Sequence, residues 1–185
     1  MNGELRLILA FVGANYLKGV FFLLGLVGTY EHNIDGKNRL FVPAKFRAIL
    51  GNEFIYKVRR SKFPSIQLYS KEQFFKEAEE AVAGIKDETR RKMVLDAKFF
   101  GTGEATCDAQ GRIVISTSIS KSAKLEKECV LTGYGNFVEI MSSEVYYEYG
   151  EELLRSAEME AESYRKEEEL RCQRRSDGAY LDTEI

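Results

Sequence analysis

Residues 35–50 read DGKNRLFVPAKFRAIL, and residues 108–123 read DAQGRIVISTSISKSA. At an offset of 73 residues, Asp35 coincides with Asp108 and Arg39 with Arg112. The apolar positions coincide as well, in the pairs Leu40 and Ile113, Val42 and Ile115, and Phe46 and Ile119. Self-similarity of this kind indicates two copies of one structural unit.

The likeness continues beyond these two stretches. Residues 66–70 (IQLYS) align with residues 138–142 (VEIMS) at an offset of 72, so a single one-residue insertion or deletion suffices. Each copy predicts a tight turn at Asp-x-x-x-Arg, a short strand, a helical turn, and later strands that end in a helix start. Asn38 and Gly111 precede the two arginines, and these residue types tolerate a positive φ best.

The end of the short strand differs between the copies. Pro43 ends the strand or opens the following helix in the first copy, whereas the second copy has Ser116 there. Strands this short leave open edges and bury little core, so a single copy is expected to be unstable. We therefore expect the two copies to intertwine in a mixed β/α, mainly β fold, with linking helices and a C-terminal helix.

The remaining segments complete the predicted organisation. Residues 71–100 are charged with helical apolar spacing, interrupted near residues 84–87, which predicts a helical hairpin or two short helices. Apolar residues recur every three to four positions over 146–164 and predict an amphipathic helix. The expected divisions are an apolar extension (1–26), repeat 1 (27–73), a helical connection (74–101), repeat 2 (102–146), a C-terminal helix (147–175) and a flexible tail (176–185).

Composition excludes several classes of protein. The 185 residues suit one compact domain or two small ones, and 44% apolar with 30% charged residues argues against global disorder or a fibre. The net charge of -2 is uneven, since residues 151–185 hold 11 acidic and 6 basic side chains, against 18 and 21 in residues 1–150. The acidic excess therefore lies in residues 151–185, and the charge of residues 1–150 is compatible with a nucleic-acid partner.

Few residues suit catalysis or metal binding. The three cysteines, Cys107, Cys129 and Cys172, are widely spaced without a Cys-x-x-Cys pair, and His32 is the sole histidine. This pattern predicts no disulfide framework and no zinc site, and reduced thiols fit the cytoplasm. Residues 101–103 (GTG) lack the Gly-Lys-Ser/Thr of a phosphate loop. We expect no enzymatic activity, no cofactor and no small-molecule substrate.

Residues 1–28 are far more apolar than the rest of the chain. Lys18 separates an uncharged run of 11 residues (7–17) from one of 12 residues (19–30), and both are shorter than the ~18 that a clean spanning helix needs. The stretch has three interpretations. It is a marginal membrane span or signal anchor, or a cleaved signal peptide, whose pattern it fits poorly. In the third interpretation, the native protein starts later and these residues are translated from DNA upstream of the true start. We favour the last, and expect no membrane association.

The repeated turns have a structural and a functional interpretation. In the first, the aspartate caps the backbone amides of the turn and the arginine pairs with it. In the second, Arg39 and Arg112 lie with Lys37, Lys45 and Arg47 on a basic surface that binds the phosphate backbone and guanine edges of DNA. A merely solvated basic surface is the alternative. Further positive charge in the first copy comes from Lys57, Arg59, Arg60 and Lys62.

Residues 28–47 (GTYEHNIDGKNRLFVPAKFR), the DAQGR motif at 108–112 and residues 130–140 (VLTGYGNFVEI) resemble the MraZ family of bacterial transcriptional regulators. The resemblance covers roughly residues 27–165. It implies two AbrB-like swapped-hairpin repeats in one pseudo-twofold barrel, and subunits that close into a ring of eight or twelve. It also implies binding to direct repeats of double-stranded DNA in the promoter of the protein's own division and cell-wall operon, in the cytoplasm and nucleoid.

The resemblance also assigns the DNA-contact motif, which falls on Asp35 with Arg39 and on Asp108 with Arg112. Ser116 and Ser120 stand where the family more typically has proline and a basic residue. We therefore expect the first copy to contribute more to DNA affinity than the second. The competing interpretation is a ring-forming scaffold whose C-terminal helix, rather than its turns, holds a protein partner.

Overall fold

The computed structural model describes the backbone of residues 25–179 and the side chains of residues 25–171. Its contacts divide the chain into two compact units, one up to Ser143 and one from Glu144 onward. Most of the predicted apolar extension and the last residues of the predicted tail lie outside the described residues. Leu26, assigned above to the extension, is instead a core residue at 1% exposure and opens the first strand.

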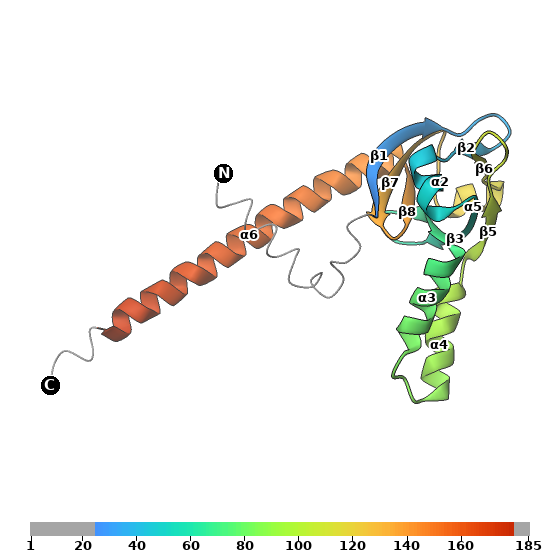
Figure 1. The fold of residues 1–185 in the computed structure, drawn as a ribbon. Coiled ribbons are helices and arrows are strands. Elements are labelled where there is room, and N and C mark those ends of the chain that lie inside the picture. Colours follow the sequence, from blue (N-terminus) through green and yellow to red (C-terminus); the bar gives the residue numbers. More distant parts are fainter. Residues whose placement is uncertain (1–24, 180–185) are drawn as a thin grey trace. The chain divides into compact units, whose positions relative to one another are not determined.

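Within the described residues, the first unit repeats one order of elements twice (Figure 1). The strands of the first copy are β1 (Leu26–Asn33), β2 (Arg39–Phe41), β3 (Glu53–Arg59) and β4 (Ser65–Ser70). Those of the second copy are β5 (Thr102–Thr106), β6 (Arg112–Val114), β7 (Glu128–Gly135) and β8 (Val138–Ser142). The short helices α2 (Ala44–Leu50) and α5 (Thr117–Ser122) occupy equivalent places after β2 and β6.

The strands pair across the two copies. One antiparallel sheet has the order β1-β7-β8-β4-β3-β5, and β2 and β6 form a separate pair. The first strand of each copy thus joins the hairpin of the other, β1 to β7 and β5 to β3. This exchange confirms that the copies intertwine. The pairings of the described strands leave β1 and β5 as sheet edges, so closure into a barrel remains a prediction.

Both copies contribute to the core, but they fill it differently. In the first copy Phe46 is fully buried and meets the ring of Tyr30 edge-on at 5.1 Å between centroids. The equivalent residues of the second copy are Ile119 and Gly103. A Cβ at Gly103 would collide with the hydroxyl oxygen of Tyr56, so the tyrosine fills the space there.

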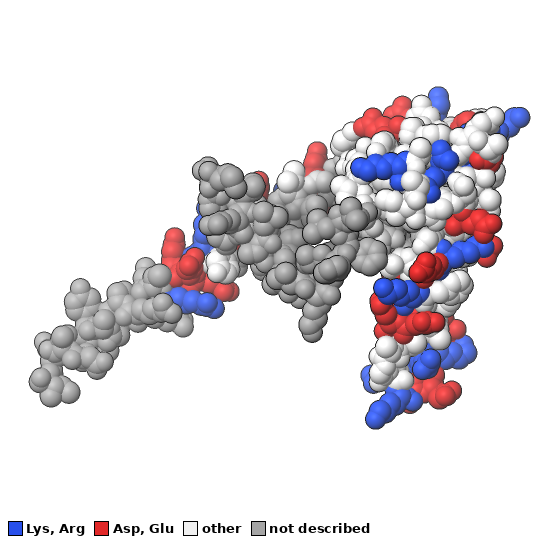
Figure 2. All heavy atoms as spheres, viewed as in Figure 1, with Lys and Arg blue, Asp and Glu red and all other residues white. Residues whose placement is uncertain are grey.

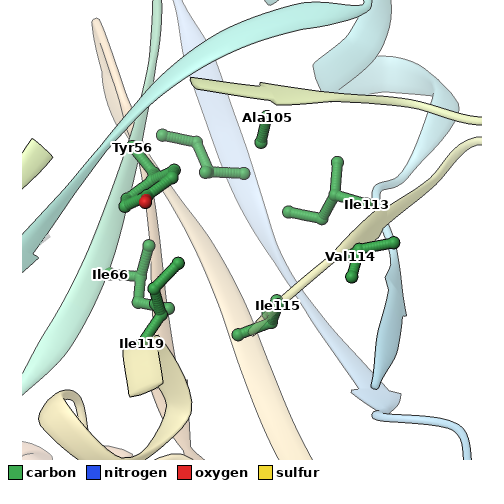
Figure 3. Close-up of a pocket in the computed structure, with 8 residues that line it drawn as sticks. Tyr56, Ile66, Ala105, Ile113, Val114, Ile115 and Ile119 are labelled. Carbon is green, nitrogen blue, oxygen red and sulfur yellow. The ribbon is translucent and has the colours of Figure 1, made fainter. Parts of the chain in front are cut away.

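A small cavity lies beside Tyr56 and Ile119, and Figure 3 shows the isoleucine side chains around it. Its volume of about 10 Å³ has room for no more than about one water molecule. The lining is apolar, with Ile113 and Ile115 from β6 and the residue after it. This gap is too small to hold a ligand.

The predicted pair of helices joins the two copies. The helices are α3 (Lys71–Val82) and α4 (Glu88–Phe99), which lie side by side (Figure 1). Ser70 accepts a hydrogen bond from the amide of Gln73 and Asp87 accepts one from Arg90, so each helix begins with a side-chain cap. Lys98 of α4 and Glu77 of α3 form an ion pair at 2.7 Å.

From Glu144 onward, the second unit is formed by the helix α6 (Ser143–Ala179). It begins before the predicted residue 147 and continues past residue 175, so residues 176–179 are helical rather than part of the predicted tail. Its composition explains the length, because glutamate, alanine, arginine and leucine are strong helix formers. No helix among the described residues is long and apolar enough to cross a membrane.

Candidate nucleic-acid interface

The first Asp-Arg turn, residues 35–39, is organised by one carboxylate. Oδ1 of Asp35 accepts hydrogen bonds from the amides of Lys37 at 2.8 Å and Arg39 at 3.0 Å. Oδ2 accepts a hydrogen bond from Nε of Arg39 at 2.8 Å and forms an ion pair with its Nη2 at 2.7 Å. The aspartate therefore fixes both the backbone of the turn and the direction of the guanidinium group.

The second Asp-Arg turn, residues 108–112, repeats this geometry. Asp108 accepts from the amides of Gln110 at 2.9 Å and Arg112 at 3.0 Å, and from Nε and Nη2 of Arg112 at 2.8 and 2.7 Å. The side-chain oxygen of Gln110 also accepts from Nη2 of Arg112. Each aspartate contacts Nε and Nη2 of its arginine, so each guanidinium group retains N–H donors for a further partner.

The ion pairs also change the titration of both carboxylates. Hydrogen bonds from the Arg39 guanidinium, followed by those from the backbone of the turn, lower the pKa of Asp35 to about 2. The same contacts from Arg112 lower the pKa of Asp108 to about 2. Both carboxylates are therefore ionised near neutral pH, and both turns keep their geometry there.

The pair β2–β6, called the ribbon below, brings the two turns together. Its register places Arg39 opposite Val114 and Phe41 opposite Arg112. Residues that oppose each other in an antiparallel pair lie on one face, and alternate residues of a strand share that face. Arg39 and Arg112, one from each copy, therefore lie on the same outer face of the ribbon, opposite its buried face.

Each turn also accepts a hydrogen bond from the other copy. The amide of Val42 donates to the carbonyl of Gly111 at 2.9 Å, and the amide of Ile115 donates to the carbonyl of Asn38 at 2.8 Å. Asn38 has φ of 55° and Gly111 has φ of 78°, as the residue types predicted. The two turns are thus held to one another reciprocally, which gives the pair a defined spacing.

Arg47 reinforces this link between the copies. Its Nε donates to the carbonyl of Val42 at 3.0 Å, and its guanidinium carbon lies 5.9 Å from the centroid of the Phe41 ring. A Cβ built at Gly111 would lie 2.7 Å from the guanidinium of Arg47, so the arginine packs over the second turn. Arg47 therefore has a structural role at the predicted site.

The two lysines of the predicted site are exposed. Lys37 lies in the first turn and Lys45 near the start of α2. Figure 2 shows a group of lysine and arginine side chains over the region that Figure 1 labels α2. Across the seven predicted residues, five cations face two carboxylates, and each carboxylate is already paired with an arginine. The excess positive charge comes from the first copy alone.

The second copy lacks these cations. At the positions equivalent to Lys37, Lys45 and Arg47 it has Gln110, Ser118 and Ser120. The hydroxyl of Ser120 instead donates to the carbonyl of Leu125 at 3.1 Å, which stabilises the end of α5. Ser116 accepts from the amide of Ile119 at 3.3 Å, so this helix begins with a side-chain cap where the first copy has Pro43.

Four other basic residues of the first copy have contacts elsewhere. Lys57 donates to the carbonyl of Ala97 at 3.4 Å, and Arg59 pairs with Glu139 at 3.2 Å. The guanidinium of Arg60 lies 5.0 Å from the ring centroid of Phe100, and the ammonium of Lys62 lies 5.0 Å from that of Phe63. These contacts support the sheet and the helical hairpin, so the four residues are not part of the turn region.

Sequence reasoning assigned no role to Phe41 and Val114, which share the outer face of the ribbon with the two arginines. Their alternation along the strands with the buried residues Leu40 and Ile113 is the sequence pattern that indicates their outward position. His32 packs edge-on against Phe41 with centroids 5.1 Å apart, and burial lowers its pKa. In the described part of the chain, no group of three or more His, Cys, Asp or Glu side chains is placed to hold a metal ion.

Comparison with known proteins identifies the family. The family model described as "MraZ protein, putative antitoxin-like" matches residues 26–95 and again residues 99–169. The chain belongs to the MraZ family. The two adjacent matches correspond to two MraZ repeats, which confirms the resemblance inferred from the sequence. The MraZ family is one of transcriptional regulators, which also confirms the expectation that the chain is not an enzyme.

Several relatives carry the name "Transcriptional regulator MraZ". The chain is 36% identical over 126 residues to one from Thermoanaerobacter pseudethanolicus (strain ATCC 33223 / 39E), covering 67% of this chain and 85% of the relative. It is 36% identical over 137 residues to one from Heliobacterium modesticaldum (strain ATCC 51547 / Ice1), covering 74% and 94%. Among solved structures, the solution structure of PHS018 from Pyrococcus horikoshii is similar at a TM-score of 0.28 and 13% identity, over 63% of this chain and 88% of that chain. That likeness is too low to support an inference.

Proposed function

We propose that this chain is a sequence-specific DNA-binding transcriptional regulator that contacts duplex DNA with the ribbon and the two Asp-Arg turns. The observation that carries the proposal is the presence of Arg39 and Arg112 on one face of a two-stranded ribbon, each oriented by an aspartate. The major groove of B-DNA admits a two-stranded β-ribbon, and arginine donors match the O6 and N7 acceptors of guanine. The ion pairs limit the motion of both guanidinium groups before DNA arrives.

The surrounding cations would bind the phosphate backbone. Lys37 and Lys45 are exposed beside the first turn, where ammonium groups can neutralise phosphates. Arg47 contributes positive charge while it holds the second turn in place. Because these cations belong to the first copy, that copy supplies most of the phosphate affinity. The mechanism is occlusion of a promoter rather than chemistry.

The wider assembly belongs to the same proposal. The exchange of strands between the copies is compatible with a closed pseudo-twofold barrel, bounded by repeats at 27–73 and 102–146. We extend this to a ring of eight or twelve subunits on direct repeats in the promoter of the chain's own division and cell-wall operon, in the cytoplasm and nucleoid. Each subunit offers a small basic face, so several subunits on repeated sites gain affinity through effective concentration.

Fluorescence anisotropy with the full chain tests the proposal. The probes are a labelled duplex from upstream of the gene and a scrambled duplex of equal composition, each titrated across a salt series. Binding preference for the upstream duplex is expected, with log K falling at a slope of about -0.9 per phosphate contact. Arg39→Ala should weaken binding, whereas Arg155→Ala on α6, with a side chain 69% exposed, should not. Equal affinity for both duplexes would contradict sequence-specific binding.

A protein-interaction scaffold is the second candidate. It is favoured by the exposed apolar side chains of α6, among them Tyr147, Leu154 and Met159. In that case neither duplex would bind at low salt, and Arg39→Ala would leave all measured properties except local stability unchanged. Light scattering of the full chain and of Leu154→Asp would then report whether α6 mediates assembly. A lower mass for the variant would support the scaffold.

A further inference from the structure

The ribbon has an apolar as well as a basic component on its outer face. Its buried face is formed by Leu40, which is 0% exposed, and Ile113, which is 2% exposed. The outer face holds Arg39 opposite Val114 and Phe41 opposite Arg112. Each arginine therefore has one apolar neighbour directly across the ribbon, supplied by the other copy.

The two apolar neighbours differ in exposure. Phe41 packs against the His32 ring at 5.1 Å between centroids, and the guanidinium of Arg47 lies 5.9 Å from its ring. Val114 is 65% exposed. The apolar surface of Phe41 is thus largely used within the protein, whereas that of Val114 is presented to the solvent beside Arg39.

We propose that Val114 is a specificity-determining residue that contacts the C5-methyl group of a thymine next to the base pair bound by Arg39. The proposal rests on the DNA binding proposed above. The thymine methyl is the apolar group that the major groove displays, and it identifies thymine there. Contact between this methyl and Val114 removes apolar surface of both molecules from water, which favours the complex.

The contact also gives the recognition a direction. Arg39 with Val114 forms one half of the outer face, and Arg112 with Phe41 forms the other. Because Phe41 is only partly exposed whereas Val114 is 65% exposed, the half with Val114 offers the larger apolar surface for discriminating a methyl group. A pseudo-symmetric face then distinguishes the two orientations of its site, as binding to direct rather than inverted repeats requires.

Replacement of thymine by deoxyuracil tests the proposal, because it removes the methyl group and keeps the Watson–Crick pairing. The probe is the upstream duplex, prepared as a series in which each thymine in turn is replaced by deoxyuracil. Dissociation constants are measured for the full chain, for Val114→Ala and for the control Val27→Ala. Val27 is 63% exposed on β1, six residues before Asn33, where the strand ends, which is about 20 Å along the strand.

For the unchanged protein and for Val27→Ala, one thymine of the bound site should stand out, with a loss of about fourfold in affinity on replacement, the value expected for one buried methyl group. Val114→Ala should bind the unmodified duplex about as weakly as the unchanged protein binds that deoxyuracil duplex, and should show no further loss on it. Its affinity for scrambled DNA and its melting temperature should match those of Val27→Ala.

Identical deoxyuracil profiles for the unchanged protein and Val114→Ala would overturn the role of Val114 while leaving DNA binding intact. An equal loss on specific and scrambled DNA would also overturn it, because a non-specific contact cannot read a methyl group. If the unchanged protein binds no duplex at low salt, the proposed function fails and the inference fails with it.

Discussion

The two repeats share the same turn geometry but differ in the charge of the residues beside their turns. In their turns, the four hydrogen-bond and ion-pair distances to the aspartate agree within 0.1 Å between the copies. At three positions around the turns, the first copy has Lys37, Lys45 and Arg47, whereas the second has the uncharged residues Gln110, Ser118 and Ser120. The turn geometry therefore depends on the aspartate, the arginine and a residue with positive φ. The neighbouring positions can diverge in charge without altering it.

In the core, too, the two copies share the inward-facing positions but differ in the residues that occupy them. Phe46 and Tyr30 fill the first copy, whereas Ile119, Gly103 and Tyr56 of β3 occupy the equivalent place in the second. The pattern of apolar positions fixes which side chains point inward, while their individual sizes adapt. One consequence is that the first copy should be the more sensitive to core truncation.

The largest expected effect is on stability. Phe46→Ala removes a fully buried ring that packs on Tyr30, and should lower the free energy of unfolding by about 3–5 kcal/mol. Ile119→Ala, at the equivalent position, removes a partly buried side chain and should cost about 2 kcal/mol or less. Urea unfolding at one protein concentration measures both. Equal losses would show that the two halves of the core are packed equally well.

The next effect concerns the packing of Arg47 over Gly111, which links the two turns. Gly111→Ala places a Cβ 2.7 Å from the Arg47 guanidinium at a φ of 78°, and should destabilise the protein by about 1–3 kcal/mol. Asn38→Gly, at the equivalent position, should change stability by less than about 1 kcal/mol, because glycine readily adopts the φ of 55°. Gly36→Ala is the control, since no atom lies within 4 Å of its added Cβ. Thermal unfolding that ranks Gly36→Ala with Gly111→Ala would contradict this packing.

A smaller effect is expected from exchanging the charges of the two copies. Lys37→Gln and Lys45→Ser give the first copy the residues of the second, and each should lower the salt dependence of DNA binding by about one unit of slope. Gln110→Lys and Ser118→Lys should raise it by about as much. Anisotropy titrations on scrambled DNA are sufficient, because phosphate contacts act on any sequence. Unchanged slopes in all four variants would place the phosphate contacts elsewhere.

The comparison also predicts one property that the copies share. Asp35 and Asp108 both have a pKa of about 2 in the folded protein, below the ordinary value near 3.9. A lowered folded pKa stabilises the fold above the unfolded pKa, and this contribution is lost as pH falls from about 4 through 2. Carboxyl carbon NMR titrations should give matching values for the two residues. Asp35→Asn should remove the first titration and leave that of Asp108 in place.

Much of the fold was accessible from the sequence because a duplication supplies its own alignment. The coincidence of Asp35 with Asp108 and of Asn38 with Gly111 predicted both turns and their positive φ values. Strand exchange followed in outline from the shortness of the strands. The order of the six strands did not follow, because period-2 patterns define faces but not neighbours.

The candidate site was only partly predictable. The two arginines were found from their repetition, but their placement on one face depends on the register of β2 with β6. The packing of Arg47 over Gly111 joins residues from different copies, and no local pattern encodes it. The start of α6 at Ser143 was missed because the apolar spacing begins later than the helix.

The central claim is that the two turns form one DNA-binding face, and a direct comparison of Arg39→Ala with Arg112→Ala tests it. Each variant is titrated against the upstream duplex by anisotropy, with Arg39→Lys and Arg112→Lys to separate the loss of charge from the loss of the bidentate donors. Both alanine variants should lose about tenfold or more in affinity, and Arg39→Ala should lose more. Wild-type affinity in both variants, at unchanged melting temperature, would contradict the account.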